Sequence, residues 1–176
     1  DYKANRSDAP DDLIPQFEFI RKSVKAFNLP SIELINYEAD DLIATYVEQI
    51  LKEGAKATIV SSDKDLMQLY KKNIRIYDPM KNKFISNEDV NNKFGVNPDK
   101  VIDVQALAGD SSDNVPGVPG IGVKTAAELI NQYGNLENLL KNVDKIKQNK
   151  RRETLIQNKD KAIVSKKLVT LKKDVP

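Results

Sequence analysis

A glycine- and proline-rich stretch at 109–122 constrains this chain more than any other part of its sequence. Its prolines fix φ and its glycines adopt backbone conformations closed to other residues, so the stretch must form a compact loop. Ile121 can anchor the loop in a core, and the apolar spacing over 123–131 predicts a helix directly after it. Glycines let a phosphate approach the backbone, and the first N–H groups of a helix can bind it. The loop therefore predicts either a contact with a nucleic-acid backbone or a tight connection between packed helices.

Upstream of this loop, helix and strand patterns alternate, which predicts an α/β body extending to about residue 85. Periodicity and breaker residues give the following segments. Helices are expected at 13–27, 38–53 (ended by Gly54) and 64–70, and strands at 33–35, 57–61, 74–77 and 84–85. Downstream, the patterns are helical only, with segments that begin near Ser86, Pro98, Val123, Leu136 and Asp144.

The 176 residues include no cysteine and no histidine. These absences exclude a cysteine nucleophile, a Ser-His-Asp triad, a histidine base, a Cys/His zinc site and any disulfide. Carboxylates, lysines, hydroxyls and metals with oxygen ligands remain for chemistry. No apolar stretch approaches the ~18 residues that a membrane span requires, so we expect no membrane partner. The absence of cysteine fits a reducing cytosol, and we expect a cytoplasmic protein.

The formal net charge of +2 conceals an uneven distribution. Residues 141–176 carry 12 basic and 4 acidic side chains, whereas residues 1–140 carry 16 basic and 22 acidic ones. A basic end joined to an acidic body predicts that one part binds a polyanion and the other part binds cations.

Three short acidic clusters lie at 38–41, 61–65 and 109–114. Their carboxylates are Glu38, Asp40, Asp41, Asp63, Asp65, Asp110 and Asp113. Each cluster also has an ordinary structural explanation, namely complementing a helix dipole, capping a helix and forming an Asx turn. If the clusters converge, however, their charges repel one another, and Mg²⁺ or Mn²⁺ would offset that repulsion without needing Cys or His. Two such ions can hydrolyse a phosphodiester, so the clusters favour a nuclease.

Four strings, in their order and spacing, resemble the 5′ nuclease family, which comprises the 5′→3′ exonuclease domains of bacterial DNA polymerases I and the flap endonucleases. The strings are Tyr2-Lys-Ala-Asn-Arg6, Tyr37-Glu-Ala-Asp-Asp41, Ser62-Asp-Lys-Asp65 and the loop at 109–122. The resemblance covers essentially the whole chain. It implies a PIN-like α/β nuclease body over 1–95 with a mostly parallel sheet, the remnant of a helical arch at 1–12, and a helix–three-turn–helix DNA-binding region over 96–176.

The resemblance also implies roles for single residues. The seven carboxylates match the metal ligands of two Mg²⁺ or Mn²⁺ sites, with Asp41 and Asp63 among the catalytic residues. Lys3 and Arg6 match basic residues that handle the scissile phosphate and the 5′ strand. The DNA-binding residues of the loop and the helix after it are expected to be Gly117, Gly120, Gly122, Lys124 and Thr125, and in relatives this loop can hold K⁺. The activity implied is 5′→3′ exonuclease and flap cleavage of DNA by a monomer, in primer removal and repair.

The chain departs from the family pattern in one respect. The family begins with a strand that carries a metal-binding aspartate, and a further aspartate precedes the arch, whereas this chain starts at the Tyr2–Arg6 string. We therefore expect an incomplete sheet and metal site, and weak or no cleavage by the 176-residue chain alone. The polymerase (transferase) part of such a protein is also outside this sequence.

Two other functions stay open. The chain could bind duplex DNA without cutting it, or it could be a receiver-like phosphoacceptor in which Asp40, Asp41 and Asp63 form an acidic pocket. The glycine-rich loop and the basic C-terminal region argue against the phosphoacceptor. A Mg²⁺-dependent cleavage assay beside a binding assay in Ca²⁺ separates a nuclease from a DNA-binding module.

Overall fold

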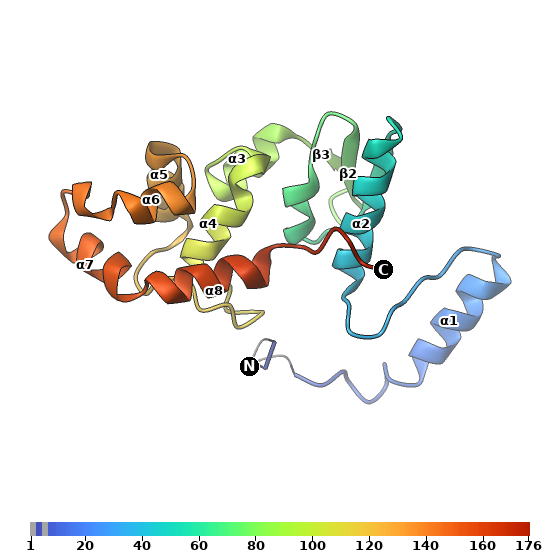
Figure 1. The fold of residues 1–176 in the computed structure, drawn as a ribbon. Helices are drawn as coiled ribbons and strands as arrows, with labels where there is room; N and C mark the ends of the chain where they lie inside the picture. Colours follow the sequence, from blue (N-terminus) through green and yellow to red (C-terminus); the bar gives the residue numbers. More distant parts are fainter. Residues whose placement is uncertain (1–2, 5–6) are drawn as a thin grey trace.

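The computed structural model describes residues 3–4 and 7–176. An α/β part built from the first half of the chain lies beside a helical part built from the second half (Figure 1). In chain order, with η for 3₁₀ helices, the elements are α1 (Gln16–Ala26), α2 (Ala39–Lys52), β1 (Ala57–Val60), η1 (Asp65–Leu69), β2 (Ile74–Asp78), β3 (Lys83–Ile85), α3 (Asn87–Phe94), η2 (Pro98–Lys100), α4 (Val101–Ala108), α5 (Val123–Tyr133), α6 (Leu136–Lys141), η3 (Val143–Lys145), α7 (Asn149–Gln157) and α8 (Lys159–Val169). The predicted α/β body and helical half are both confirmed.

The sheet has β2 at its centre, between β1 and β3. β1 and β2 are parallel, with Ala57 opposite Ile74, whereas β2 and β3 are antiparallel, with Ile76 opposite Ile85. The three strands predicted in this region are thus present. The described sheet is mixed rather than mostly parallel, because a short turn joins β2 to β3 and such a turn can connect only antiparallel strands.

The strand predicted at 33–35 is wrong. In the described part of the chain this segment pairs with no strand, and the side chain of Ile35 is 85% exposed. An apolar pattern does not make a strand unless a neighbouring backbone offers hydrogen-bond partners. The short helix predicted at 64–70 is a 3₁₀ helix, η1.

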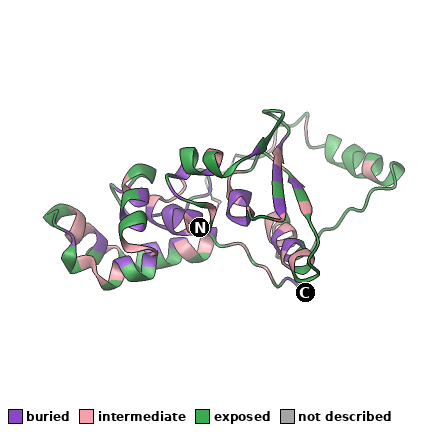
Figure 2. Ribbon diagram, turned by 90° about the horizontal axis from the view of Figure 1, so that it is seen from above, coloured by how far each residue is buried: buried purple, intermediate pink, exposed green. Residues whose placement is uncertain are grey.

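The helix α2 matches the strongest periodic pattern of the sequence. It buries Ala44, Thr45 and Val47 on one side, and Figure 2 shows this buried face against an exposed outer face. Gly54, just after the helix, has a φ of +71°, as a residue that ends a helix commonly does. The helix α2 packs against β1 and η1, the two elements that flank the second acidic cluster.

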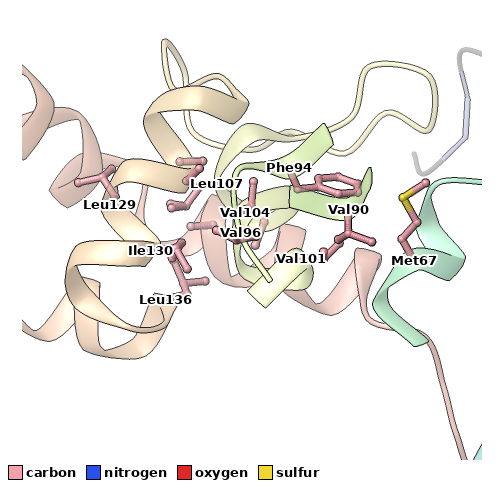
Figure 3. Close-up of a cluster of buried hydrophobic side chains, with 14 of the residues drawn as sticks. Met67, Val90, Phe94, Val96, Val101, Val104, Leu107, Leu129, Ile130 and Leu136 are labelled. Atoms are coloured by element: carbon pink, nitrogen blue, oxygen red, sulfur yellow. The ribbon is translucent and has the colours of Figure 1, made fainter. Parts of the chain in front are cut away.

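The core of the helical half surrounds α4, which packs against α5 and α8. Figure 3 shows Val104 and Leu107 of α4 toward Ile130 of α5 and Leu136 of α6, and Val101 of α4 toward Val90 and Phe94 of α3. The side chains of Val101, Val104, Leu107, Ile130 and Leu136 are at most 1% exposed. This burial explains why α4 is apolar on nearly all sides. Ile121 is 5% exposed and anchors the glycine-rich loop in this core, as expected.

After α8 the chain runs as an extended strap, residues 170–175, back to α2 (Figure 1). The side chain of Gln68 in η1 donates from Nε2 to the carbonyl oxygen of Val169 over 3.0 Å and accepts from the N–H of Leu171 over 3.3 Å. Farther along, the N–H of Val175 donates to Oγ1 of Thr45 in α2 over 3.2 Å. These bonds join the end of the helical half to the α/β half.

The helix α1 lies apart from the body of the molecule (Figures 1 and 2). None of its side chains is buried, and Phe19 and Phe27 are 64% and 77% exposed. No helix in the part of the chain that the structure describes, α1 included, is long and apolar enough to cross a membrane.

Candidate functional site

The three acidic clusters of the sequence meet around one small cavity. Its volume is about 30 Å³, which is enough to hold a water molecule. Six of the seven carboxylates predicted to bind metal line this cavity. We call its lining the acidic pocket, which consists of Lys3, Glu38, Asp40, Asp63, Asp65, Asp110, Asp113, Val115, Leu168, Val169 and Leu171.

The first cluster reaches the pocket because it starts α2. Glu38 precedes the helix and forms a capping box with Asp41, whose Oδ2 accepts the N–H of Glu38 over 3.3 Å. The other oxygen of Asp41 accepts the N–H of Lys172 in the strap over 2.8 Å. Asp41 is therefore the one predicted metal ligand that the structure does not place in the pocket lining. It joins the start of α2 to the strap instead.

The second cluster follows β1 and leads into η1. Asp63 is exposed, and its Oδ1 accepts the N–H of Asp65 over 2.9 Å, as expected for a residue that caps a helical turn. Oδ1 of Asp65 accepts a hydrogen bond of 2.6 Å from Nε2 of Gln105 in α4. The helical half thus holds a carboxylate of the α/β half directly.

The third cluster lies in the loop after α4. The backbones of Asp110 and Val115 pair through hydrogen bonds of 3.0 and 2.8 Å. Oδ1 of Asp110 accepts the N–H of Ser112 over 2.9 Å, which is the expected Asx turn, and its Oδ2 pairs with Nζ of Lys64. Asp113 is 9% exposed, and its carbonyl oxygen accepts the N–H of Lys3 over 2.9 Å. The loop therefore brings Asp110 and Asp113 to the pocket, and its backbone holds Lys3 beside them.

Burial and the neighbouring negative charges raise the pKa of two carboxyl groups in the acidic pocket. Burial, followed by the charges of Asp63, Asp65 and Glu38, raises the pKa of Asp40 to about 6, against the opposing charge of Lys3. Burial likewise raises the pKa of Asp65, although the hydrogen bond from Gln105 opposes the rise. An added cation would favour the ionised form of both carboxyls.

Two lysines partly neutralise the pocket. Lys3 forms an ion pair with Glu38, and Lys64 forms one with Asp110. Burial opposes ionisation of Asp110, but the hydrogen bonds from Lys64 and Ser112 outweigh it and lower the pKa of that carboxyl. The same pairing raises the pKa of Lys64 despite its burial.

The donor set of the pocket fits a hard divalent cation, because it offers carboxylate oxygens and no nitrogen or sulfur ligand. Among the described residues, however, no three acidic side chains lie close enough together to hold a metal ion by themselves. Mg²⁺ commonly binds through one or two carboxylates and keeps several waters. Glu38, Asp40, Asp63, Asp65, Asp110 and Asp113 are the residues that could hold such ions here.

The glycines of the loop have different surroundings. Gly117 is buried, has a φ of +57°, and donates its N–H to Oγ of Ser165 in α8 over 2.9 Å. Gly120 is exposed with a φ of +75°, and Gly122 is exposed with a φ of −87°. The expectation that the turn itself requires glycine at 122 is therefore wrong, since that φ suits any residue. A β-carbon at 120 or 122 would meet no other atom within 4 Å.

The start of α5 lies beside the start of α7. Gly122 caps α5 without a side-chain hydrogen bond, and exposed Lys124 and half-buried Thr125 lie in the first turn. A hollow of about 510 Å³ separates the tip of the loop from α7. It is lined by Pro119, Gly120, Ile121, Gln148, Asn149, Lys150, Arg151 and Thr154. Backbone N–H groups at a helix start, flanked by basic side chains, form a surface suited to phosphates.

The two basic residues expected to handle the scissile phosphate are Lys3 and Arg6. Lys3 lines the acidic pocket, whereas Arg6 lies outside the described residues. The sequence did not indicate the contact of Gln105 with Asp65 or that of Lys64 with Asp110. The available signals were a polar residue inside the apolar segment 101–108 and a lysine between two aspartates, and neither signal identifies a partner.

Comparisons with known proteins point to a single family. The family described as "5′-3′ exonuclease, N-terminal resolvase-like domain" matches residues 1–95, and "5′-3′ exonuclease, C-terminal SAM fold" matches residues 96–176. The chain is 58% identical to DNA polymerase I of Rhizobium leguminosarum over 175 residues, which cover 99% of this chain and 17% of that protein. It is 40% identical to a 5′-3′ exonuclease of Buchnera aphidicola, with coverage of 100% of this chain and 64% of the relative.

Solved structures show the same fold. The D15 protein of T5, co-crystallized with metal ions, superposes with a TM-score of 0.82 at 22% identity, covering 96% of this chain and 66% of that one. The catalytic core of Rad2 in complex with DNA substrate gives a TM-score of 0.55 at 19% identity, covering 95% and 59%. The chain thus spans about two thirds or less of these structures and about a sixth of the Rhizobium polymerase.

Proposed function

Because this chain belongs to the 5′-3′ exonuclease family, we propose that its acidic pocket hydrolyses phosphodiester bonds near a 5′ end or a 5′ flap of DNA. The observation that supports this most is the convergence of six carboxylates from three distant segments on one cavity. Neither a helix dipole nor an Asx turn requires such convergence, and it is electrostatically unfavourable without a cation.

We propose Mg²⁺ or Mn²⁺ as that cation, held in two sites by Glu38, Asp40, Asp63, Asp65, Asp110 and Asp113. Ions of this kind, when bound, activate water and neutralise charge on a phosphate. The protein's own part is to hold the carboxylates in place. Lys3, which pairs with Glu38 at the edge of the pocket, is placed to meet a phosphate there.

Duplex DNA would bind through the loop tip and the starts of α5 and α7. Gly120, Gly122 and Lys124 are exposed on this surface, and Lys150 and Arg151 lie across the hollow. Such contacts to the backbone fix the position of DNA without reading its sequence. A K⁺ ion at the loop stays a prediction of the family resemblance.

Cleavage of a labelled 5′-flap duplex in Mg²⁺ by the protein with the family's N-terminal strand restored, beside binding of the same DNA in Ca²⁺, tests the proposal. Asp63→Ala should lower the cleavage rate by orders of magnitude while changing DNA affinity little, because a lost metal ligand acts on the transition state more than on the complex. Asp160→Ala, an exposed acidic residue of α8, is the matched control and should cleave like the parent. Equal losses of affinity and rate in Asp63→Ala would contradict a metal role.

One observation favours a second function, a DNA-binding module that does not cut. No three of the described acidic side chains lie close enough together to hold an ion. The same assay separates the two functions. Tight binding in Ca²⁺ together with no cleavage in Mg²⁺ by the 176-residue chain would support the binding module for this chain.

A further inference from the structure

Gln105 is a buried polar residue in the apolar helix α4, with 4% of its surface exposed. Its Nε2 donates to Oδ1 of Asp65 over 2.6 Å. Its Oε1 is buried and has no hydrogen-bond partner in the part of the chain that the structure describes. The carboxylate of Asp65 is thus the polar contact that the Gln105 side chain makes.

The orientation of this amide follows from its neighbour. If the amide were turned over, Oε1 would face the carboxylate, and two acceptors would repel each other. With Nε2 toward Asp65, the oxygen is left unpaired in the core, which is unfavourable for stability. A leucine of similar size would avoid that penalty, so stability alone does not explain a glutamine at this position.

The position of Gln105 in the chain connects two acidic clusters. Its carbonyl oxygen accepts the N–H of Gly109 over 2.8 Å at the end of α4, and Asp110 follows directly. The side chain of Gln105 therefore ties Asp65 of η1 to the helix that leads to Asp110. Both aspartates line the acidic pocket, and this bond is a direct link between the segments that carry them.

We propose that Gln105 is a positioning residue that orients Asp65 and fixes its separation from Asp110, and thereby sets the affinity of the acidic pocket for divalent cations. This inference rests on the proposed function, because it assumes that the pocket binds such ions. Partners that orient metal ligands in this way typically change metal affinity 10–100-fold when they are removed.

The test is Mn²⁺ binding by titration calorimetry and unfolding by urea in EDTA, both with the complete 176-residue chain. Gln105→Leu removes the donor and the unpaired oxygen together. We expect it to weaken Mn²⁺ binding by about tenfold. The midpoint of urea unfolding should change little, because loss of the hydrogen bond to Asp65 offsets removal of the unpaired oxygen.

Gln68→Leu is the matched control, because Gln68 is a glutamine of similar burial in η1 whose amide is satisfied by the strap. It should lower the unfolding midpoint and leave Mn²⁺ affinity well short of the tenfold loss expected for Gln105→Leu. Unchanged Mn²⁺ affinity in Gln105→Leu would refute the role of Gln105 and leave the proposed function standing. A parent chain that bound no Mn²⁺ would refute the metal site and this inference together.

Discussion

Gly109 and Gly117 lie so close together that a β-carbon on Gly117 would be 2.5 Å from the backbone nitrogen of Gly109. Both have positive φ angles, +71° and +57°. Two turns of the loop therefore pack backbone against backbone, where no side chain fits. This contact sets the path of the chain between α4 and α5.

We expect Gly117→Ala to destabilise the protein by roughly 2–4 kcal/mol, because it adds a left-handed φ penalty to a clash with backbone. Gly120→Ala also places alanine at a positive φ, but its β-carbon would meet no other atom within 4 Å. It should therefore lower the stability by only about 1 kcal/mol. Gly122→Ser should be neutral within about 0.5 kcal/mol, since serine is a favourable N-cap. Urea unfolding in EDTA measures all three, and an equal effect at the three positions would contradict this ranking.

The exposed end of the loop separates folding from binding. Gly122→Val should keep the fold, as circular dichroism will check, because its β-carbon would meet no other atom within 4 Å. If a phosphate approaches there, the substitution should weaken duplex binding by more than about 1 kcal/mol, comparable to losing a hydrogen bond to a charged group. Mn²⁺ binding in the acidic pocket should survive. Parental duplex affinity in the folded variant would mean that the loop only connects two helices.

Asp40 gives a pH dependence whose sign is fixed. Its pKa is about 6 in the folded chain against an ordinary value of 3.8, so the folded state holds a proton that the unfolded state has released between these values. Its contribution to stability is complete below about pH 4 and is lost as the pH rises through about 6. Asparagine at position 40 cannot ionise, so Asp40→Asn should not lose stability as the pH rises through about 6.

Without divalent ions, Asp40→Asn should therefore be more stable than the parent at pH 7.5 by roughly 1–2 kcal/mol, a value reduced for the partial exposure of the pocket. At pH 4 the two proteins should be about equal. The change belongs to the whole carboxylate cluster rather than to one residue. Urea unfolding at both pH values measures it, and a stability difference that does not vary with pH would contradict the raised pKa.

Asp41 and Asp63, both predicted to be catalytic, should differ in how much each contributes to the stability of the fold. Asp41 accepts two backbone N–H groups, from Glu38 and from Lys172, whereas exposed Asp63 accepts one. Asp41→Ala should therefore cost about 1–2 kcal/mol of stability as a lost cap and strap contact. Asp63→Ala should cost less than about 1 kcal/mol. Urea unfolding in EDTA that ranked the two in the opposite order would show that Asp41 does not hold the strap.

The elements predicted well are those whose signals are local. The helix α2 has an apolar stripe, a capping box and Gly54 within a short stretch, and these features act regardless of the rest of the fold. The strand expected at 33–35 failed because a strand depends on a neighbour, and an apolar triplet does not reveal one. The glycine string predicted a compact loop, yet it did not reveal that Gly117 needs a positive φ and Gly122 does not.

In the candidate site too, local sequence signals were predictive, whereas contacts between distant segments were not. The acidic clusters at 38–41, 61–65 and 109–114 were expected to be functional because together they offer carboxylate ligands for divalent ions without Cys or His. The bond between Gln105 and Asp65 spans 40 residues, so no periodicity or spacing in the sequence indicates it. The contact of Asp41 with the strap spans 131 residues and was missed for the same reason.

The basic C-terminal region should make the binding of duplex DNA depend on the salt concentration. If the loop tip and this region bind duplex phosphates, log K should fall linearly with log salt, with a slope of about −0.9 per phosphate neutralised. Exposed Lys124 in the first turn of α5 should account for one phosphate, so Lys124→Ala should reduce the slope by about one and weaken all duplex sequences alike. Lys71→Ala is the control, because Lys71 lies outside this region, already pairs with Glu48 at 3.3 Å and should leave the slope unchanged. Fluorescence anisotropy of a labelled duplex at several salt concentrations measures both slopes. A loss confined to particular sequences would mean that Lys124 reads bases, and an equal effect of the two substitutions would place the bound DNA elsewhere on the basic surface.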